Sequence, residues 1–347
     1  MAYIRVVLVG LAVILGASSA SAQTLINGAG ATFPYPLYSK WFDEYAKIDA
    51  AMRFNYQSIG SGGGIRQITA RTVDFGATDG PMTDEQLKAA PAELLHIPAV
   101  LGAVVATYNL PGNPRLRFTP EVLADIFLGK ITKWSDPRLK EVNAGVSLPD
   151  QPIVVVHRSD GSGTTYIWVD YLSKVSPDWE KAVGRGTSVK WPVGLGGKGN
   201  EGVAGQVKST PGALGYVELA YALKNNLPAP AIRNKAGKFV EPTIKSTTAA
   251  AGGAAATMPR DFRVSLTDPP GDDAYPVASF TWLLVYRAQP DEVKGKAIVN
   301  FLWWAIHDGQ KYATDLLYAP LPVPVVKQVE TTLRQIVFQG RPLLAAR

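Results

Sequence analysis

The residues best suited to chemistry in this chain lie in one short stretch, RSDGSGTT, at positions 158–165. Arginine offers a planar fork of hydrogen-bond donors, and hydroxyl groups and main-chain amides add further donors. Such a set of donors suits an oxyanion such as phosphate. A carboxylate stands in the same loop, so the site is not simply cationic. The candidate residues of this stretch are Arg158, Asp160, Ser162, Gly163 and Thr164.

The elements on either side of this stretch explain how it could be held in place. Residues 153–156 form a β-branched apolar run that predicts a short buried strand. After the loop, Ile167, Val169 and Leu172 recur as on one side of a helix. The pattern therefore predicts a strand, a glycine-rich turn and a helix. The first amides of that helix have no internal partner and carry the positive end of the helix dipole.

A second group of candidate donors follows the glycine turn at residues 28–31. Pro34 and Pro36 sit where a helix can begin, since proline is tolerated in the first turn. Thr32 then occupies a cap position, and the amides of Thr32 and Phe33 are exposed at the turn. A simple N-cap without any ligand is the alternative interpretation of Thr32.

Two more candidates, Ser61 and Asp79, each follow a predicted strand. Ser61 lies in the glycine-rich turn 60–64, after the strand 53–56 and before a helical pattern. A glycine and serine run is most often only a flexible loop. Here it lies between periodic elements, which favours a functional turn. Asp79 ends the strand that begins near Val73, and it is either a turn residue or an acceptor facing a ligand.

The order of elements predicts the fold class. Strands alternate with helices along the chain, which indicates parallel α/β sheets covered on both faces. The 347 residues are enough for two domains. Ligands of such sheets bind beyond the carboxyl ends of the strands, where the glycine-rich turns lie.

Residues 1–22 predict a secretory signal peptide. They contain a single charge at Arg5, an apolar stretch and the cleavage pattern Ala20-Ser21-Ala22. An N-terminal membrane anchor is the alternative. The chain has no cysteine, which excludes disulfides, thiol chemistry and lipid attachment at an N-terminal cysteine. We therefore expect a soluble, exported protein that is not lipid-anchored. The net charge of +6 is spread without a basic block, which disfavours a nucleic-acid groove.

Common enzyme motifs fail on specific residues. The stretch around Lys198 lacks the serine or threonine and the first glycine of a nucleotide phosphate loop. Neither Ser61 nor Ser162 fits the G-x-S-x-G pattern of a hydrolase nucleophile. The histidines show no metal-ligand spacing, so we expect no metal site and no cofactor. A serine nucleophile at Ser162 stays possible but lacks an evident partner.

Four stretches together resemble the ligand-contacting segments of the PstS family, the periplasmic phosphate-binding proteins of phosphate ABC importers. Residues 190–202 and 211–221 are also similar to that family, and residues 228–265 are the least characteristic. The departures are small: His157 and Ser159 in the loop, and a third glycine in place of an extra serine after Ser61. The four stretches are GAGATFP (28–34), GSGG (60–63), VDFGATD (73–79) and RSDGSGT (158–164).

The resemblance implies a fold, a site and partners. The fold would be α/β, a two-lobe periplasmic-binding-protein-like (type II) architecture with two chain crossovers and the ligand in the interlobe cleft. Lobe I would comprise residues 23–103 and 277–347, and lobe II residues 104–276. The protein would be a periplasmic monomer that captures inorganic phosphate and delivers it to the membrane permease subunits of an ABC importer.

The resemblance also assigns roles to residues. Thr32 and Phe33 would supply amides and a hydroxyl, Ser61 a hydroxyl and an amide, and Asp79 would accept the proton of the bound phosphate. From the other lobe would come Arg158, oriented by Asp160, together with Ser162, Gly163 and Thr164.

Two alternatives to a phosphate receptor stay open. One is an enzyme, a phosphatase or serine hydrolase, that uses the same oxyanion-binding turns. The other is a receptor for sulfate or molybdate. Asp79 argues against the latter, because an ionised carboxylate accepts a hydrogen bond from phosphate but repels the unprotonated oxygens of sulfate.

Overall fold

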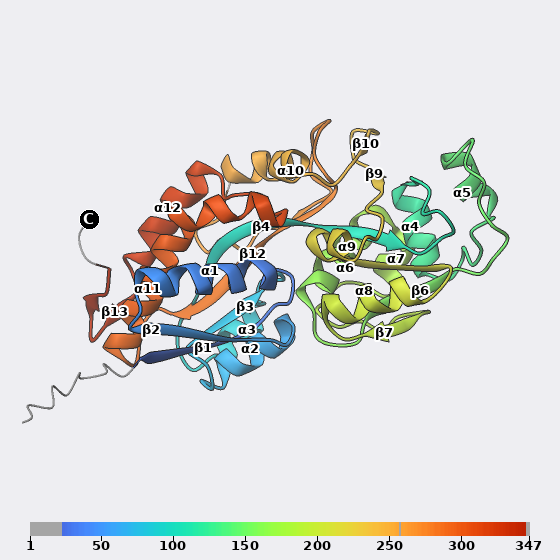
Figure 1. The fold of residues 1–347 in the computed structure, drawn as a ribbon. Helices are drawn as coiled ribbons and strands as arrows, with labels where there is room; N and C mark the ends of the chain where they lie inside the picture. Colours follow the sequence, from blue (N-terminus) through green and yellow to red (C-terminus); the bar gives the residue numbers. More distant parts are fainter. Residues whose placement is uncertain (1–22, 257, 345–347) are drawn as a thin grey trace, which may run out of the picture.

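The computed structural model describes residues 23–256 and 258–344, so the predicted signal peptide at residues 1–22 lies outside the described residues. Figure 1 shows the course of the chain. The strands are β1 (Thr24–Gly30), β2 (Met52–Ser58), β3 (Phe75–Thr78), β4 (Leu94–Tyr108), β5 (Arg117–Phe118), β6 (Val154–Arg158), β7 (Leu195–Gly197), β8 (Ala213–Glu218), β9 (Ala231–Arg233), β10 (Phe239–Val240), β11 (Leu266–Thr267), β12 (Val277–Tyr286), β13 (Val337–Phe338) and β14 (Arg341–Pro342). The helices are α1 (Tyr35–Ile48), α2 (Ser61–Thr69), α3 (Asp84–Ala89), α4 (Pro120–Phe127), α5 (Pro137–Val142), α6 (Gly163–Val175), α7 (Pro177–Ala182), α8 (Gly199–Ser209), α9 (Leu219–Lys224), α10 (Ile244–Ala256), α11 (Glu292–Ile306) and α12 (Val323–Leu333), with the 3-10 turns η1 (Asp308–Tyr312) and η2 (Thr314–Leu316).

Two lobes share the long strand β4, as Figure 1 shows. The main sheet has the strand order β2-β1-β3-β12-β4-β8-β6-β7, with β11 beside β12. Strand β4 pairs with β12 up to Ala103 and with β8 from Val104 onward. One half of the sheet, from β2 to β12, belongs to lobe I, and the other half, from β8 to β7, belongs to lobe II.

The direction of the strands corrects one expectation. Strands β1, β2 and β3 are parallel to one another, as are β6, β7 and β8. The central strands are not parallel: β12 runs antiparallel to both β3 and β4, and β4 runs antiparallel to β8. The sheet is therefore mixed. The alternation of strands and helices could not show this. It does not specify the direction of β12, which is far in the sequence from its neighbours β3 and β4.

The lobe boundaries at 103/104 and 276/277 remain predictions. The change of partner along β4, between Ala103 and Val104, supports the first boundary. Strand β11 pairs with β12, so residues just before 276 lie against lobe I. Helix α10 also packs on β12 and β4. Both elements fall within the range predicted for lobe II.

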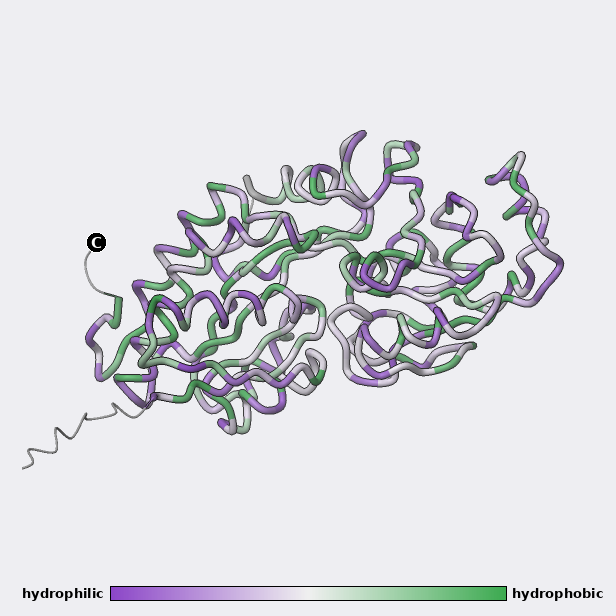
Figure 2. Tube along the Cα trace, in the orientation of Figure 1, coloured by the Kyte–Doolittle hydropathy of each residue, from purple (hydrophilic) through white to green (hydrophobic). Residues whose placement is uncertain are grey.

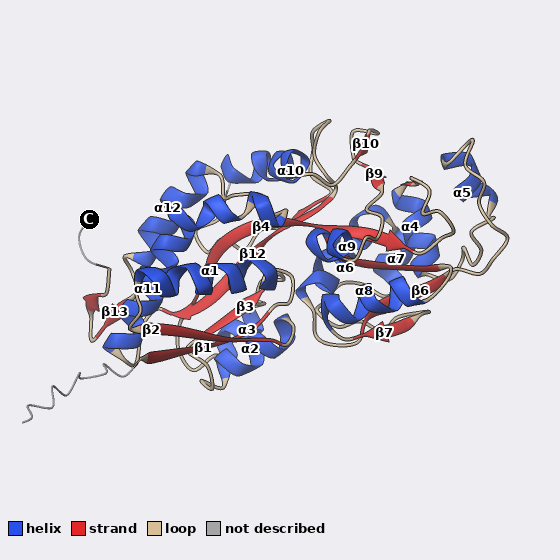
Figure 3. Ribbon diagram, in the orientation of Figure 1, coloured by secondary structure: helices blue, strands red, loops and turns tan. Residues whose placement is uncertain are grey.

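The core follows the long apolar strands. Every residue of β12 is buried, and β4 is buried at all positions but one. Figure 2 shows hydrophobic stretches in green along the traces of both strands. Helices lie on both sides of the strands in Figure 3, which explains why these strands are buried along nearly their whole length and not at alternate positions. None of the helices in the described ranges is long and apolar enough to cross a membrane.

Candidate functional site

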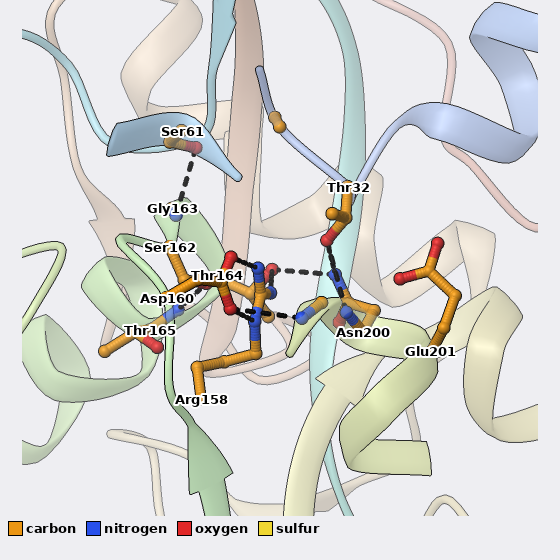
Figure 4. A network of polar contacts seen from close by, with 12 residues as sticks. Thr32, Ser61, Arg158, Asp160, Ser162, Gly163, Thr164, Thr165, Asn200 and Glu201 are labelled. Atoms are coloured by element: carbon orange, nitrogen blue, oxygen red, sulfur yellow. Dashed lines mark hydrogen bonds and ion pairs between the residues drawn. The ribbon is translucent and has the colours of Figure 1, made fainter. Parts of the chain in front are cut away.

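Four helices begin at the place where the two lobes meet. Helix α1 follows the turn at Thr32, α2 begins at Ser61, α6 begins at Gly163 and α8 begins at Gly199. Each of these four helices starts within five residues of a strand end, as expected for ligand sites of α/β sheets. Figure 4 shows side chains from all four starts converging. The positive ends of the helix dipoles therefore point into one small region.

Ser61 joins the lobes at this point. Its Oγ accepts hydrogen bonds from the main-chain N–H of Gly163 at 3.0 Å and of Asp79 at 3.1 Å. Gly163 belongs to lobe II, whereas Ser61 and Asp79 belong to lobe I. Figure 4 shows the contact between Ser61 and Gly163. The O–H of Ser61 makes only a long hydrogen bond, to Oδ2 of Asp79 at 3.4 Å, and could be donated to a ligand in its place.

Asp79 is a buried carboxylate at the end of β3. Thr281 donates a hydrogen bond to its Oδ1 at 2.8 Å, and the hydroxyl of Ser61 lies 3.4 Å from its Oδ2. Only 1% of Asp79 is exposed. Burial raises the pKa of Asp79 to about 7, although the hydrogen bond from Thr281 and the charge of Arg158 oppose that shift. Asp79 is thus poised between its ionised and protonated forms near neutral pH.

Arg158 and Asp160 form a buried, two-pronged ion pair. The Nε of Arg158 donates to Oδ1 of Asp160 at 2.8 Å, and its Nη2 donates to Oδ2 at 2.6 Å. The side chain of Arg158 is 1% exposed. Burial raises the pKa of Asp160, but the hydrogen bonds and charge of Arg158 outweigh this and hold it below its ordinary value. The ion pair leaves Nη1 of Arg158 on the side of Thr164, whose Oγ1 lies 3.4 Å away.

Asn200 connects the two lobes and was not predicted as a site residue. Its side-chain Nδ2 donates to Oγ1 of Thr32 at 2.7 Å and to Oγ1 of Thr164 at 3.1 Å, as Figure 4 shows. Its Oδ1 accepts from the main-chain N–H of Glu218. The sequence contained one signal for it, because Asn200 lies in a glycine-rich turn before a helical pattern.

Several main-chain amides at the helix starts are free to bind an anion. Among the described residues, no hydrogen-bond acceptor contacts the N–H groups of Thr32, Phe33, Ser61 or Thr164. All four residues are buried, and a buried N–H without a partner is costly. Four such groups gathered at converging helix starts, beside an arginine, form a binding site for a small oxyanion.

The predicted residues differ in how they contribute. The structure brings Ser61, Asp79 and Gly163 into direct contact. It links Thr32 to Thr164 through Asn200, and Thr164 in turn contacts Arg158. Phe33 contributes its main chain, since its ring is buried and its carbonyl accepts a hydrogen bond from Tyr318 at 2.6 Å.

Ser162 caps helix α6. Its Oγ accepts a hydrogen bond from the main-chain N–H of Thr165 at 3.0 Å, so this contact organises the helix start. The hydroxyl hydrogen of Ser162 is not used by that contact and can still be donated. A cap is a common structural role for serine, and it gives no support to a serine nucleophile.

The lobes are in close contact around the site. The N–H of Gly62 donates to the carbonyl of Gly161 across the interface at 2.9 Å. A Cβ atom on Gly163 would lie 2.5 Å from Oγ of Ser61 and 2.6 Å from Cβ of Asp79. Only glycine at position 163 permits this approach. The structure is therefore a closed form in which the site is shielded from solvent.

The histidines and acidic residues do not form a metal centre. Within the described residues no group of three or more histidine, cysteine, aspartate or glutamate side chains could hold a metal ion. His157 stacks on Trp191 with ring centroids 4.7 Å apart, and His96 accepts a hydrogen bond from the N–H of Met82. Both histidines therefore have structural contacts outside the site.

Comparison of the sequence with known families places the chain in one of them. A model of the PBP superfamily domain matches residues 17–308. The phosphate-binding protein PstS of Pasteurella multocida (strain Pm70) is 49% identical over 317 residues, which cover 90% of this chain and 91% of that protein. PstS of Xylella fastidiosa (strain 9a5c) is 48% identical over 309 residues, covering 88% and 84% of the two chains.

Solved structures agree with this placement at the level of the fold. A phosphate-binding protein from Stenotrophomonas maltophilia has a TM-score of 0.70 at 18% identity, covering 89% of this chain and 94% of its own. A high affinity periplasmic phosphate-binding protein solved with bound phosphate has a TM-score of 0.72 at 19% identity, covering 92% and 96%. The chain therefore belongs to the PstS family of phosphate-binding proteins, within the PBP superfamily.

Proposed function

We propose that this protein binds one inorganic phosphate ion between its lobes and delivers it to a phosphate ABC importer. The observation that carries this function is the cluster of unpaired amides at Thr32, Phe33, Ser61 and Thr164, which lies beside Arg158. A tetrahedral anion with several acceptor oxygens would satisfy donors that come from both lobes at once. The relatives in the same family carry the name phosphate-binding protein.

The proposed contacts come from both lobes. Lobe I supplies the amides of Thr32 and Phe33, the amide and hydroxyl of Ser61, and the carboxylate of Asp79. Lobe II supplies the guanidinium of Arg158, fixed by Asp160, together with groups at the start of α6. Those α6 groups are the hydroxyl of Ser162, the amide of Gly163, and the amide and hydroxyl of Thr164. The contact between Ser61 and the Gly163 amide would be exchanged for contacts with the anion.

Asp79 would distinguish phosphate from sulfate. Phosphate near neutral pH carries a hydrogen on at least one oxygen, so it can donate to a carboxylate, whereas sulfate offers only acceptors. Facing sulfate, an ionised Asp79 would lose its hydrogen bond and meet a like charge in a buried site. An unpaired buried polar group costs about 1–3 kcal/mol, and more when it is charged. Selectivity therefore rests on rejecting the wrong ion.

Binding would be coupled to closure of the lobes. The residues on the two sides of the site touch one another only in a closed arrangement such as the one described here. An anion that bonds to both sides favours that arrangement over an open one, because it makes more contacts in it. The closed lobes would then be the form that the permease subunits recognise.

The proposed location is the periplasm, with the chain exported and not lipid-anchored. The predicted signal peptide at residues 1–22 and the absence of cysteine from the sequence support this location. The proposed state is a monomer whose partners are inorganic phosphate and the permease, with no nucleic acid.

The alternative of a phosphatase or serine hydrolase is not supported. The chain belongs to a family of binding proteins and is not an enzyme. Within the site, the oxygens of Ser61 and Ser162 each accept main-chain hydrogen bonds, which position them as donors to an anion.

Isothermal titration of the purified protein with phosphate, sulfate and arsenate tests the proposal. We expect one site per chain, with phosphate bound far more tightly than sulfate at pH 8, where Asp79 is ionised. Equal affinities for phosphate and sulfate would contradict the role of Asp79. Absence of phosphate binding would contradict the function.

A further inference from the structure

We propose that Thr281 is a positioning residue whose hydroxyl fixes the Asp79 carboxylate with one oxygen toward the anion, and so sets the preference for phosphate over sulfate. This inference rests on the proposed function, and it assigns part of the specificity to a residue that lies far from the four glycine-rich stretches. Thr281 lies in β12 among mostly apolar residues, so the surrounding sequence indicates only a core position.

A β-bulge in β4 lies directly opposite Thr281. Thr281 pairs with Val100 of β4, but the next residue, Trp282, pairs with Pro98, so Ala99 is an extra residue in the ladder. Such a bulge bends a strand locally and redirects a side chain, and bulges often stand beside functional sites. Here Thr281 is completely buried and its hydroxyl reaches Asp79 at the end of the neighbouring strand β3.

Thr281 leaves one of the two carboxylate oxygens of Asp79 to a ligand. Thr281 has a single O–H, which lies 2.8 Å from Oδ1 of Asp79 and 3.4 Å from the carbonyl of Thr78. The shorter contact takes the hydrogen, so Oδ1 is occupied. Oδ2 has only the long 3.4 Å contact with the hydroxyl of Ser61, itself a proposed ligand residue. Oδ2 is therefore the oxygen that accepts the hydrogen of phosphate.

Thr281 also influences the charge of Asp79 more than its other neighbours do. Burial raises the pKa of Asp79 most strongly, and the largest opposing effect is the hydrogen bond from Thr281, ahead of the charge of Arg158 and the hydrogen bond from Ser61. Several phenols and one further carboxyl also face Asp79. These groups are Tyr38, Tyr56, Glu218 and Tyr318.

Sulfate reports the charge of Asp79 directly. It stays a dianion across the neutral pH range, so any proton needed for its binding must come from the protein. Only a protonated Asp79 can donate to sulfate, and sulfate affinity should rise as the pH falls through the pKa of Asp79, about 7. Without the hydroxyl of Thr281, Asp79 keeps its proton to higher pH. Sulfate binding should then persist to higher pH as well.

The test measures sulfate affinity from pH 5.5 to 9, by competition with phosphate, in wild type and variants. Thr281→Val removes the hydroxyl donor and keeps the shape of the side chain. We expect the pH at which sulfate affinity has fallen to half its low-pH value, the sulfate midpoint, to rise by about one pH unit. At pH 8 the preference for phosphate over sulfate should fall about tenfold. Thr281→Ser keeps a hydroxyl and should restore the wild-type curve. If Thr281→Val does not fold, Thr281→Ala removes the same hydroxyl and is measured in the same way.

A matched control separates positioning from general damage. Thr107 is an equally buried threonine of β4 whose hydroxyl donates to the carbonyl of Pro228, away from the site. Thr107→Val should leave the sulfate midpoint unchanged. The inference is overturned if Thr281→Val has the same sulfate midpoint as wild type, or if Thr107→Val raises that midpoint as much as Thr281→Val does. Phosphate binding by wild type is measured first, since its absence would refute the proposed function and not merely the role of Thr281.

Discussion

At the scale of single residues, recognition depends on two buried charges with opposite tasks. Arg158 is held by two hydrogen bonds to Asp160, and its Nη1, which Asp160 does not contact, makes a long hydrogen bond to Thr164 at the start of α6. Asp79 is buried without a direct ion-pair partner, and its carboxylate accepts from hydroxyl groups. The arginine attracts any oxyanion, whereas the aspartate accepts only one that carries a hydrogen. Affinity and selectivity can therefore be separated by mutation.

Arg158→Ala should weaken phosphate binding by several kcal/mol, because it removes a buried charged donor and leaves Asp160 without its partner. Titration calorimetry measures the loss. Arg233→Ala is a suitable control, since Arg233 forms an ion pair with Glu121 at the surface and should not affect binding. A loss below about 0.5 kcal/mol for Arg158→Ala would count against Arg158 as a ligand.

Asp79→Asn should reduce selectivity more than affinity. An asparagine amide can donate to an unprotonated oxygen, so sulfate is no longer repelled, while phosphate keeps its other contacts. A competition titration of phosphate against sulfate at pH 8 gives the ratio of the two affinities. An unchanged ratio would show that Asp79 does not select the ligand.

The pKa of Asp79 also predicts a pH-dependent cost to stability. The folded value of about 7 lies above the ordinary 3.8, so the folded state holds the proton more tightly than the unfolded chain. The contribution of Asp79 to the free energy of unfolding is fully present at low pH and is lost as the pH rises through about 7. In phosphate-free buffer, we therefore compare the free energy of unfolding of Asp79→Asn with that of wild type at two pH values. The difference should shift by about 2 kcal/mol in favour of the variant between pH 5.5 and pH 8. Urea unfolding at the two pH values checks this, and a constant difference would contradict the raised pKa.

At the scale of elements, the site depends on four helix starts that approach one another closely. Gly163 opens α6 against Ser61 and Asp79, where a Cβ atom would lie 2.5–2.6 Å from its neighbours. Gly62 and Gly161 also meet across the interface, with the N–H of one bonded to the carbonyl of the other. These glycines let the two lobes bring their unpaired amides to a single anion.

Gly163→Ala should prevent full closure and weaken phosphate binding at least tenfold, because the added methyl overlaps Ser61 and Asp79 only when the lobes are closed. Gly205→Ala in α8 is the control, since no atom lies within 4 Å of the position of its added methyl. That control should bind normally and gain roughly 0.5–1 kcal/mol of stability, as alanine favours a helix. Normal binding by Gly163→Ala would show that closure does not require the contact.

The sequence predicted the elements around Arg158 and Ser61 well but missed the role of α8. Strand β6 and helix α6 lie close to the pattern of apolar residues at 153–172. Helix α8 begins at Gly199, inside a glycine-rich stretch. Its first turn has poor intrinsic helix propensity because of its glycines. Long-range contacts compensate, since Asp160 accepts from the N–H of Gly199 and Thr32 accepts from that of Asn200. No local pattern reports such contacts.

Thr281 was missed for a related reason. It lies in a strand that is buried throughout, so its neighbours in sequence indicate only core. Its contact with Asp79 depends on strand order, because β12 is inserted between β3 and β4, and a bulge at Ala99 of β4 lies opposite it. Both features arise from pairings far apart in the chain. Sequence patterns therefore located the charged and glycine-rich residues, whereas the residues that support them required the folded structure.

At the scale of the whole molecule, one anion should hold the two lobes together. Strand β4 runs through both lobes, and closure brings Asn200 and Gly163 of lobe II onto Thr32 and Ser61 of lobe I. A ligand that bonds to both lobes shifts the balance from open to closed by its extra contacts in the closed form. Binding and shape are therefore linked.

Phosphate should make wild type both more compact and more stable. At about 1,000 times its dissociation constant, phosphate should raise the free energy of unfolding by about 4 kcal/mol. Small-angle X-ray scattering should show a smaller radius of gyration with phosphate in wild type and little change in Gly163→Ala. An equal decrease in both proteins would show that compaction does not depend on the approach of Gly163 to Ser61.

The most direct measurement is a crystal structure of the protein grown with inorganic phosphate. We expect one phosphate enclosed between the lobes. Its oxygens should bond to Arg158 and to the amides of Thr32, Phe33, Ser61 and Thr164, and one oxygen should lie against Oδ2 of Asp79. A phosphate bound elsewhere, or closed lobes in which these groups contact only one another in saturating phosphate, would contradict this expectation.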